Sequence, residues 1–173
     1  MKRIAALFLL ALPLLASAQA KKINWMTIEE AYALSITETN PKPVFIDVYT
    51  DWCGWCKRMD QTTFKDEKVV AYMNEHFYNV KFDAEQQEPI NIMDHEFKFV
   101  ANGRRGYNEL AAALLNGKMS YPTVVFLNAK FEMITPVPGY QDATAFAPIA
   151  QFIGSKAYKN QSFEEFTASL STE

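Results

Sequence analysis

The chain contains two cysteines, Cys53 and Cys56, within the run Asp51-Trp52-Cys53-Gly54-Trp55-Cys56-Lys57. An apolar stretch, Val44 to Tyr49, comes directly before this run. Because the chain has no third cysteine, a disulfide within the monomer must close a ring of four residues. So short a loop stabilises a folded protein very little. The sequence therefore favours redox chemistry as the role of the pair.

The first twenty residues have the layout of an export signal. Lys2 and Arg3 provide a positive start, residues 4–15 are apolar with one proline, and both Ala16-Ser17-Ala18 and Ala18-Gln19-Ala20 fit the small-x-small cleavage rule. The apolar run is shorter than the ~20 residues that span a bilayer, which argues against a retained membrane anchor. We expect a signal peptide at 1–20, cleaved after Ala18 or Ala20, and a periplasmic or secreted protein with no membrane insertion after cleavage.

Charge and size limit the classes of partner. The formal net charge is −3, and removal of Lys2 and Arg3 with the signal would make it −5. This mild acidity argues against a nucleic-acid or anionic-membrane partner. Residues 21–173 are enough for one domain, which we expect to be a monomer that buries a core without disulfide support. A small secreted domain that needs such support carries more cysteines.

Alternating helix and strand patterns predict one α/β domain with a central mixed sheet flanked by helices. Thr27 and Glu30 form a capping-box pattern at a helix start. The segment at about 84–118 is polar, contains the turn signal Asn102-Gly103 and is expected to include a helix. The predicted strands are 44–49, 77–82, 123–127 and 131–136, and the predicted helices are 28–37, 54–62, 67–76, 107–115, 143–155 and a short tail at 160–170.

The position of the cysteine pair predicts a division of labour. A strand that ends near Thr50 and a helix that starts near Cys53 place the first sulfur at a helix N-terminus, where free N–H groups and the helix dipole stabilise a thiolate. Cys53 is therefore the predicted attacking nucleophile, and Cys56 the predicted resolving thiol. Lys57 adds a positive charge that would lower the thiol pKa, although it fits a solvated surface lysine equally well. No cofactor beyond the disulfide is expected.

Asp47 is the one polar residue of the apolar stretch before the cysteines. Burial of a carboxylate costs free energy and raises its pKa, so its presence on such a strand needs a reason. We predict that Asp47 accepts the proton of Cys56 when that thiol attacks. The alternative is an aspartate that caps a neighbouring backbone.

Residues 45–57 resemble the active-site strand and helix of thioredoxins, in which a buried aspartate lies six residues before the first cysteine, as Asp47 does here. Residues 62–69 are still more similar to the C-terminal thioredoxin-like domain of bacterial transmembrane thiol:disulfide interchange proteins. The resemblance covers about residues 24–157 and implies a thioredoxin-like fold. It makes the segment at 84–118 a helical insertion before the next central strand.

The resemblance also implies the surroundings of the disulfide. It makes the Tyr121-Pro122 peptide bond cis and places it opposite the cysteines, with the Tyr121 backbone free to pair with an extended substrate. A proline at a strand start is also tolerated for structural reasons alone. Trp52 and Trp55 are expected to contact substrate, and Gly139 matches a family glycine that allows a loop to approach the site.

Three features depart from the family pattern. Trp55 stands where a proline is frequent, which leaves the redox potential open, and Gln61 stands where thioredoxins carry a helix-kinking proline. The insertion at 84–118 is the third. It either packs on the sheet or, near Asn102-Gly103, shapes the choice of partner.

We therefore predict an exported thiol–disulfide oxidoreductase that exchanges disulfides with protein thiols, with a reductase or reshuffling role and a membrane electron donor or oxidant as a further partner. The alternative is a noncatalytic thioredoxin-fold binding module or chaperone. No metal site is expected. Haem attachment would need a histidine where Lys57 stands, and zinc would need His76 and His95 to join the cysteines.

Overall fold

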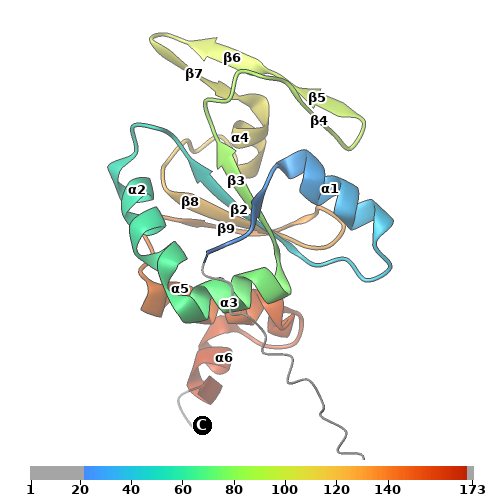
Figure 1. Cartoon of the computed structure of the whole chain (residues 1–173), viewed down its shortest axis with the longest axis vertical. Helices are drawn as coiled ribbons and strands as arrows, with labels where there is room; N and C mark the ends of the chain where they lie inside the picture. The colour runs from blue at the N-terminus through green and yellow to red at the C-terminus, as the bar shows by residue number, and fades with distance from the viewer. Residues whose placement is uncertain (1–21, 171–173) are drawn as a thin grey trace, which may run out of the picture.

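The computed structural model describes residues 22–170, so the predicted signal peptide lies outside the described residues. A five-stranded sheet in the order β1-β3-β2-β8-β9 forms its centre (Figure 1). Strands β1 and β2 run parallel to β3, while β8 is antiparallel to both β2 and β9. The predicted mixed α/β sheet is therefore confirmed. Its strands are β1 (Trp25–Met26), β2 (Val44–Tyr49), β3 (Tyr78–Asp83), β8 (Thr123–Leu127) and β9 (Met133–Pro138).

Helices cover both faces of this sheet (Figure 1). Buried side chains of α1 and α4 pack on one face, and those of α2, α3 and α5 pack on the other. Most boundaries predicted for the long helices hold to within one residue. The helices are α1 (Ile28–Thr37), α2 (Gly54–Gln61), α3 (Glu67–His76), α4 (Glu109–Leu114), α5 (Ala143–Gly154) and α6 (Phe163–Leu170), with short 3₁₀ turns η1 (Thr63–Lys65) and η2 (Ala157–Lys159).

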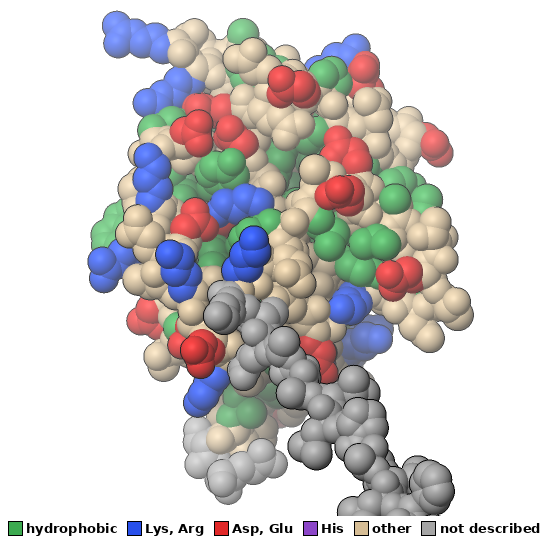
Figure 2. All heavy atoms as spheres, viewed as in Figure 1, with side chains coloured by type: hydrophobic (Ala, Val, Ile, Leu, Met, Phe, Trp, Pro, Cys, Tyr) green, Lys and Arg blue, Asp and Glu red, His purple; other side chains and the backbone are tan. Residues whose placement is uncertain are grey.

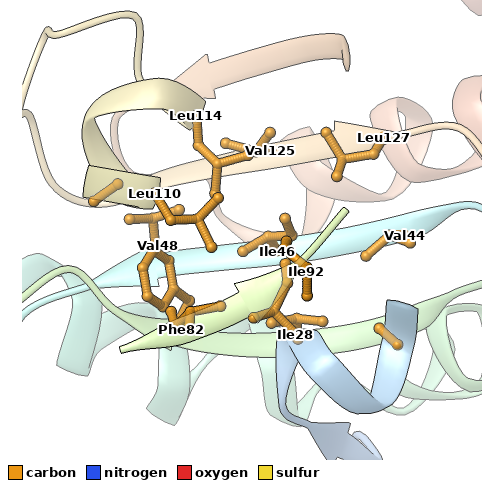
Figure 3. Close-up of a cluster of buried hydrophobic side chains, with 14 of the residues drawn as sticks. Ile28, Val44, Ile46, Val48, Phe82, Ile92, Leu110, Leu114, Val125 and Leu127 are labelled. Carbon is orange, nitrogen blue, oxygen red and sulfur yellow. The ribbon is translucent and has the colours of Figure 1, made fainter. Parts of the chain in front are cut away.

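Alternation along β2 decides which face each side chain meets. Val44, Ile46 and Val48 join the core beneath α1 and α4, where Ile28 and Leu110 approach them (Figure 3). Phe45 points the other way, into the core beneath α2, α3 and α5. Because successive strand residues face opposite sides, Asp47 lies on the same face as Phe45. The predicted buried carboxylate therefore faces the helix that carries the cysteines.

The starts of the helices follow the expected capping chemistry. The Thr27 side chain accepts a hydrogen bond from the Glu30 backbone, and Glu30 accepts one from the Thr27 backbone, so the predicted capping box is confirmed. At the start of α6, Ser162 and Glu165 make the same reciprocal pair. Each of these caps satisfies backbone N–H groups that have no partner within the helix.

The insertion differs from its prediction. It contains two antiparallel hairpins, β4 (Ile90–Ile92) with β5 (His95–Phe97) and β6 (Phe99–Asn102) with β7 (Arg105–Asn108), where the sequence predicts one irregular segment. Strands of three or four residues are too short for a period-2 pattern to stand out. The turn predicted at Asn102-Gly103 is confirmed, since Asn102 pairs with Arg105 across it and Gly103 has a φ of 60°.

The helix predicted at 107–115 is also shorter than expected. Tyr107 and Asn108 end β7, and α4 begins only at Glu109. The Asn108 side chain accepts a hydrogen bond from the Leu110 backbone, which makes it the N-cap rather than a residue within the helix. A capping asparagine marks a helix boundary, and the apolar spacing alone did not locate it.

The last strand of the sheet begins later than the predicted 131–136. Phe131 has a φ of 62° and belongs to the turn, so β9 starts at Met133. The Asn128 side chain accepts hydrogen bonds from the backbones of Lys130 and Glu132, which extends the turn past its expected end. Asparagine favours such local hydrogen bonds over continued strand pairing.

Among residues 22–170, no helix combines the length and apolar character needed to cross a bilayer.

Candidate active site

Cys53 and Cys56 form a disulfide at the start of α2. Cys53 is the N-cap residue, as the sequence predicts, and its sulfur accepts a hydrogen bond from the Cys56 backbone at 3.1 Å. Cys53 is 5% exposed and Cys56 1% exposed. When the disulfide is reduced, the same N–H group and the helix dipole favour a thiolate on Cys53, while Cys56 is the more buried of the two.

Asp47 lies fully buried on β2, on the face that α2 covers. Its Oδ2 atom forms an ion pair with Lys81 Nζ, and its Oδ1 atom has no hydrogen-bond partner among the described residues. Burial raises the pKa of Asp47 to about 6, against the opposing effect of Lys81. A carboxyl group with this pKa exchanges protons close to neutral pH, which is what a general base requires.

Lys81 also pairs with a second carboxylate, that of Asp60 on α2. Burial lowers the pKa of Lys81, but Asp47 and Asp60 outweigh it, so the pKa lies above its ordinary value. The ammonium group lies over three aromatic rings, at 5.3 Å from Trp25, 4.7 Å from Tyr49 and 5.7 Å from Phe64. Carboxylates and ring faces together hold this cation beneath the helix that carries the cysteines.

Sequence reasoning missed Lys81 and Asp60, although a signal was present. Asp47 and Lys81 occupy directly opposite positions in the parallel pair β2–β3. Alignment of the two predicted strands in register would have shown opposite charges facing each other. Asp60 lies four residues after Cys56, which is one turn of the same helix.

Exposed tryptophans lie on both sides of Cys53. Trp52 is 50% exposed and packs edge-on against Tyr121, with ring centroids 5.8 Å apart. Trp55 is 63% exposed and lies 5.2 Å from the ring of Tyr140, a residue that the sequence did not single out. Exposed aromatic rings therefore lie beside the disulfide.

The Tyr121–Pro122 peptide bond is cis. Thr123, the next residue, pairs with Val48 near the end of β2, so the loop lies at the edge of the sheet from which the cysteine segment emerges. Gly139 has a φ of 90°, and its backbone donates a hydrogen bond to the Pro122 carbonyl at 2.8 Å. Burial and the charges of Glu85 and Asp83 raise the pKa of Tyr121 to about 12.

The structure also locates Lys57 and Gln61, which the sequence singled out. Lys57 is exposed in the first turn of α2, so its effect on the cysteines stays a prediction. Helix α2 ends at Gln61, the position where thioredoxins carry a kinking proline.

Among residues 22–170, no three His, Cys, Asp or Glu side chains are grouped so as to hold a metal ion.

Arg105 of the insertion contacts Trp52, next to Cys53. Its guanidinium lies 4.1 Å from the centre of the Trp52 ring, and the indole N–H of Trp52 donates a hydrogen bond to Glu85 at 3.0 Å. The sequence located the turn of this hairpin but not the residue that makes the contact.

A disulfide at the N-terminus of the helix after a central strand, with a buried aspartate below it and a cis-proline loop at the same edge of the sheet, defines a thioredoxin-like protein. The chain belongs to the family Thioredox_DsbH, described as "Protein of unknown function, DUF255", whose model matches residues 6–153. The protein is therefore a thioredoxin-like relative of the thiol:disulfide interchange proteins.

Individual relatives agree with this assignment. The chain is 28% identical over 132 residues to the thiol:disulfide interchange protein DsbD of Yersinia pestis (strain Pestoides F), covering 73% of this chain and 19% of that one. It is 26% identical over 128 residues to DsbD of Photorhabdus laumondii, covering 71% of this chain. The chain thus spans about a fifth of the length of these relatives.

Solved structures share the fold. A putative disulphide-isomerase from Bacteroides thetaiotaomicron is 28% identical, with a TM-score of 0.56 over 84% of this chain and 100% of that one. A DsbH oxidoreductase is 17% identical, with a TM-score of 0.56 over 91% of this chain and 96% of that one. The predicted thioredoxin-like fold is confirmed.

Proposed function

We propose that this protein is an exported thiol–disulfide oxidoreductase that reduces or reshuffles disulfides of other proteins. The observation that carries the proposal is the Cys53–Cys56 disulfide at the start of α2, with the Cys53 sulfur at the N-cap. The names of the DsbD relatives, thiol:disulfide interchange proteins, support the same class of reaction.

The reaction begins with the reduced protein. The Cys53 thiolate attacks one sulfur of a partner disulfide; that S–S bond breaks, a Cys53–partner bond forms, and the other partner sulfur leaves as a thiolate that takes up a proton. Cys56 then loses its proton and attacks Cys53. The mixed disulfide breaks, the second partner thiolate is released, and the Cys53–Cys56 bond forms. Two electrons pass from the protein to its partner.

Asp47 is proposed to take the proton of Cys56 in the second step. Its pKa of about 6 leaves it largely ionised at neutral pH, and its Oδ1 atom has no other partner among the described residues. Lys81 holds the other oxygen and keeps the carboxyl group beneath α2. Asp47 thus acts on the resolving thiol, whereas the N-terminus of the helix acts on Cys53.

Trp52, Trp55 and the Tyr121–Pro122 loop are proposed to bind the partner. Both tryptophans expose half or more of their surface beside the cysteines. An extended segment of the partner would lie along the Tyr121 backbone, with its cysteine next to Cys53. The protein carries no further cofactor in this proposal, and it needs a thiol donor, such as a membrane electron-donor protein, to reduce Cys53–Cys56 again.

A disulfide-exchange assay tests the function. The wild-type protein, given dithiothreitol, should accelerate insulin reduction, and Cys53→Ser should abolish the acceleration. The exposed Trp52 and Trp55 would also suit a noncatalytic binding module. A wild-type protein that neither reduces insulin nor oxidises a dithiol peptide, yet binds unfolded clients, would establish that second function instead.

Export is a separate part of the proposal. Expression of the full chain in a bacterium should yield a periplasmic product whose intact mass corresponds to cleavage after Ala18 or Ala20. A cytoplasmic product that retains Met1 would contradict it.

A further inference from the structure

The β6–β7 hairpin places a cation, Arg105, beside one of the aromatic rings near the disulfide. Arg105 is the first residue of β7, and its guanidinium lies 4.1 Å from the centre of the Trp52 ring. Trp52 in turn contacts Tyr121 of the cis-proline loop and donates a hydrogen bond to Glu85. The hairpin projects from the end of the molecule beyond α4 (Figure 1). Three segments distant in the sequence therefore meet at one indole ring.

The guanidinium of Arg105 lies over the Trp52 ring, and this contact does not use its N–H donors. Arg105 is exposed, and no ion pair or side-chain hydrogen bond joins it to another residue of the part of the chain that the structure describes. A guanidinium carries five N–H donors in its own plane, which a ring stacked on its face does not use. Their fork geometry matches a carboxylate in two-point contact.

Acidic and basic side chains lie on different sides of Trp52. Glu85 lies at the indole N–H edge, and Glu85 and Asp83 both raise the pKa of Tyr121, so the side near the cis-proline loop is acidic. Arg105 lies over the face of the ring, with Arg104 next to it in the hairpin turn. Acidic and basic side chains are interspersed over the face that Figure 2 shows. A carboxylate of a partner is therefore attracted toward the hairpin and repelled near the loop.

We propose that Arg105 is a specificity-determining residue, which selects partner segments with an aspartate or glutamate near the cysteine that exchanges with Cys53. The proposal rests on the disulfide exchange proposed above. It assigns to the hairpin a role in choosing substrates, because Arg105 lies over Trp52, the residue before Cys53, but has no place in the proton and sulfur transfers.

A competition experiment measures this preference directly. In the Cys56→Ala variant, the Cys53 thiolate attacks a peptide whose single cysteine carries a 2-pyridyl disulfide. The pyridyl S–S bond breaks, a Cys53–peptide bond forms, and pyridine-2-thione leaves with a proton. Each experiment mixes equal amounts of two peptides that differ at one position, where one has Glu and the other Gln. The experiment is repeated for successive positions on either side of the cysteine. Mass spectrometry gives the ratio of the adducts.

The expected ratio is about threefold to fivefold in favour of Glu at one or more positions, the size of an exposed charge pair, and it should fall as salt is added. Arg105→Gln should bring the ratio to one, and a thermal unfolding midpoint equal to that of the Cys56→Ala parent shows that the variant is folded. Arg105→Lys keeps the charge but loses the planar fork, so it should retain only part of the preference. Arg104→Gln, the matched neighbour, should keep most of it.

The outcomes separate the two proposals. Adducts that form equally with Glu and Gln peptides at every position would overturn the role of Arg105 and leave the exchange reaction intact. An equal loss of preference in Arg104→Gln would also overturn it, because the effect would then be one of general charge. If no adduct forms with any peptide, Cys53 is not the attacking thiol, and both proposals fall.

Discussion

Asp47 and Lys81 lie directly opposite each other on the parallel strands β2 and β3, and their side chains form an ion pair beneath the cysteine-bearing helix. The pair is not isolated from other charges, because Lys81 also forms an ion pair with Asp60. One cation therefore serves two carboxylates, of which one is fully buried. This arrangement links the pH dependence of folding to that of the proposed reaction.

The first prediction concerns stability and pH. The pKa of Asp47 is about 6 in the folded protein, against an ordinary 3.8, so folding favours the protonated carboxyl group. The stabilisation is complete below about pH 4 and is lost as the pH rises through about 6. Between pH 4 and pH 7, the oxidised wild type should lose about 2 to 3 kcal/mol of unfolding free energy relative to Asp47→Asn. Urea unfolding at the two pH values measures this difference, and equal losses in both proteins would contradict it.

The second prediction concerns Lys81→Met. Loss of the cation removes the interaction that lowers the pKa of Asp47, so this pKa should rise above about 6. A carbon NMR titration of the Asp47 carboxyl group measures the change. Removal of one partner from a buried ion pair should also cost about 2 to 4 kcal/mol of unfolding free energy at pH 8. The control is Lys57→Met at an exposed position, where the cost should stay within about 0.5 kcal/mol.

The third prediction concerns the resolving step. In Asp47→Asn, release of a preformed Cys53 mixed disulfide by Cys56 should slow by about a hundredfold at pH 7, because the proton acceptor is lost. Stopped-flow release measured against pH should show an ionisation near pH 6 in the wild type and none near that pH in this variant.

Asp60→Asn is the control for that step. It should retain the ionisation at a lower pH, since the Asp60 charge is one cause of the raised pKa of Asp47. An unchanged pH profile in Asp47→Asn would show that Asp47 is not the base.

The fourth prediction compares two glycines. Gly139 has a φ of 90°, which a residue with a Cβ atom adopts only under strain, although a Cβ atom there would meet no neighbour within 4 Å. Gly139→Ala should therefore lower the unfolding free energy by about 1 to 2 kcal/mol. Gly54, at the start of α2, has equal space without that φ, so Gly54→Ala should raise stability by about 0.5 to 1 kcal/mol. Thermal unfolding of both variants measures the contrast, and equal effects would refute the role of the φ angle.

The central architecture was predictable because its signals are strong. The strand at 44–49 is continuous and apolar, and Thr27 with Glu30 marks a helix start from local chemistry alone. Cys53 at a helix start follows from the strand that precedes it. Each of these features depends on residues close together in the sequence.

The missed features depend on pairing across the fold. Lys81 becomes part of the site only when β3 lies in register beside β2, and Asp60 only when α2 packs over that face. Tyr140 reaches Trp55 from a distant loop. The sequence did not predict the hairpins of the insertion, because strands of three or four residues carry too little periodic signal. Tertiary contacts, rather than local propensity, decide the positions of Lys81, Asp60 and Tyr140.

Strands β4 to β7 pair only with one another among the described residues, and none of them extends the five-stranded sheet. Changes in the length or sequence of the β6–β7 turn therefore leave the register of β2, β3 and β8 undisturbed. Under the role proposed for Arg105, a change in this hairpin alters the choice of partner without moving the strands that position Asp47 and Cys53. The proposed choice of partner and the proposed reaction therefore depend on separately paired pieces of backbone.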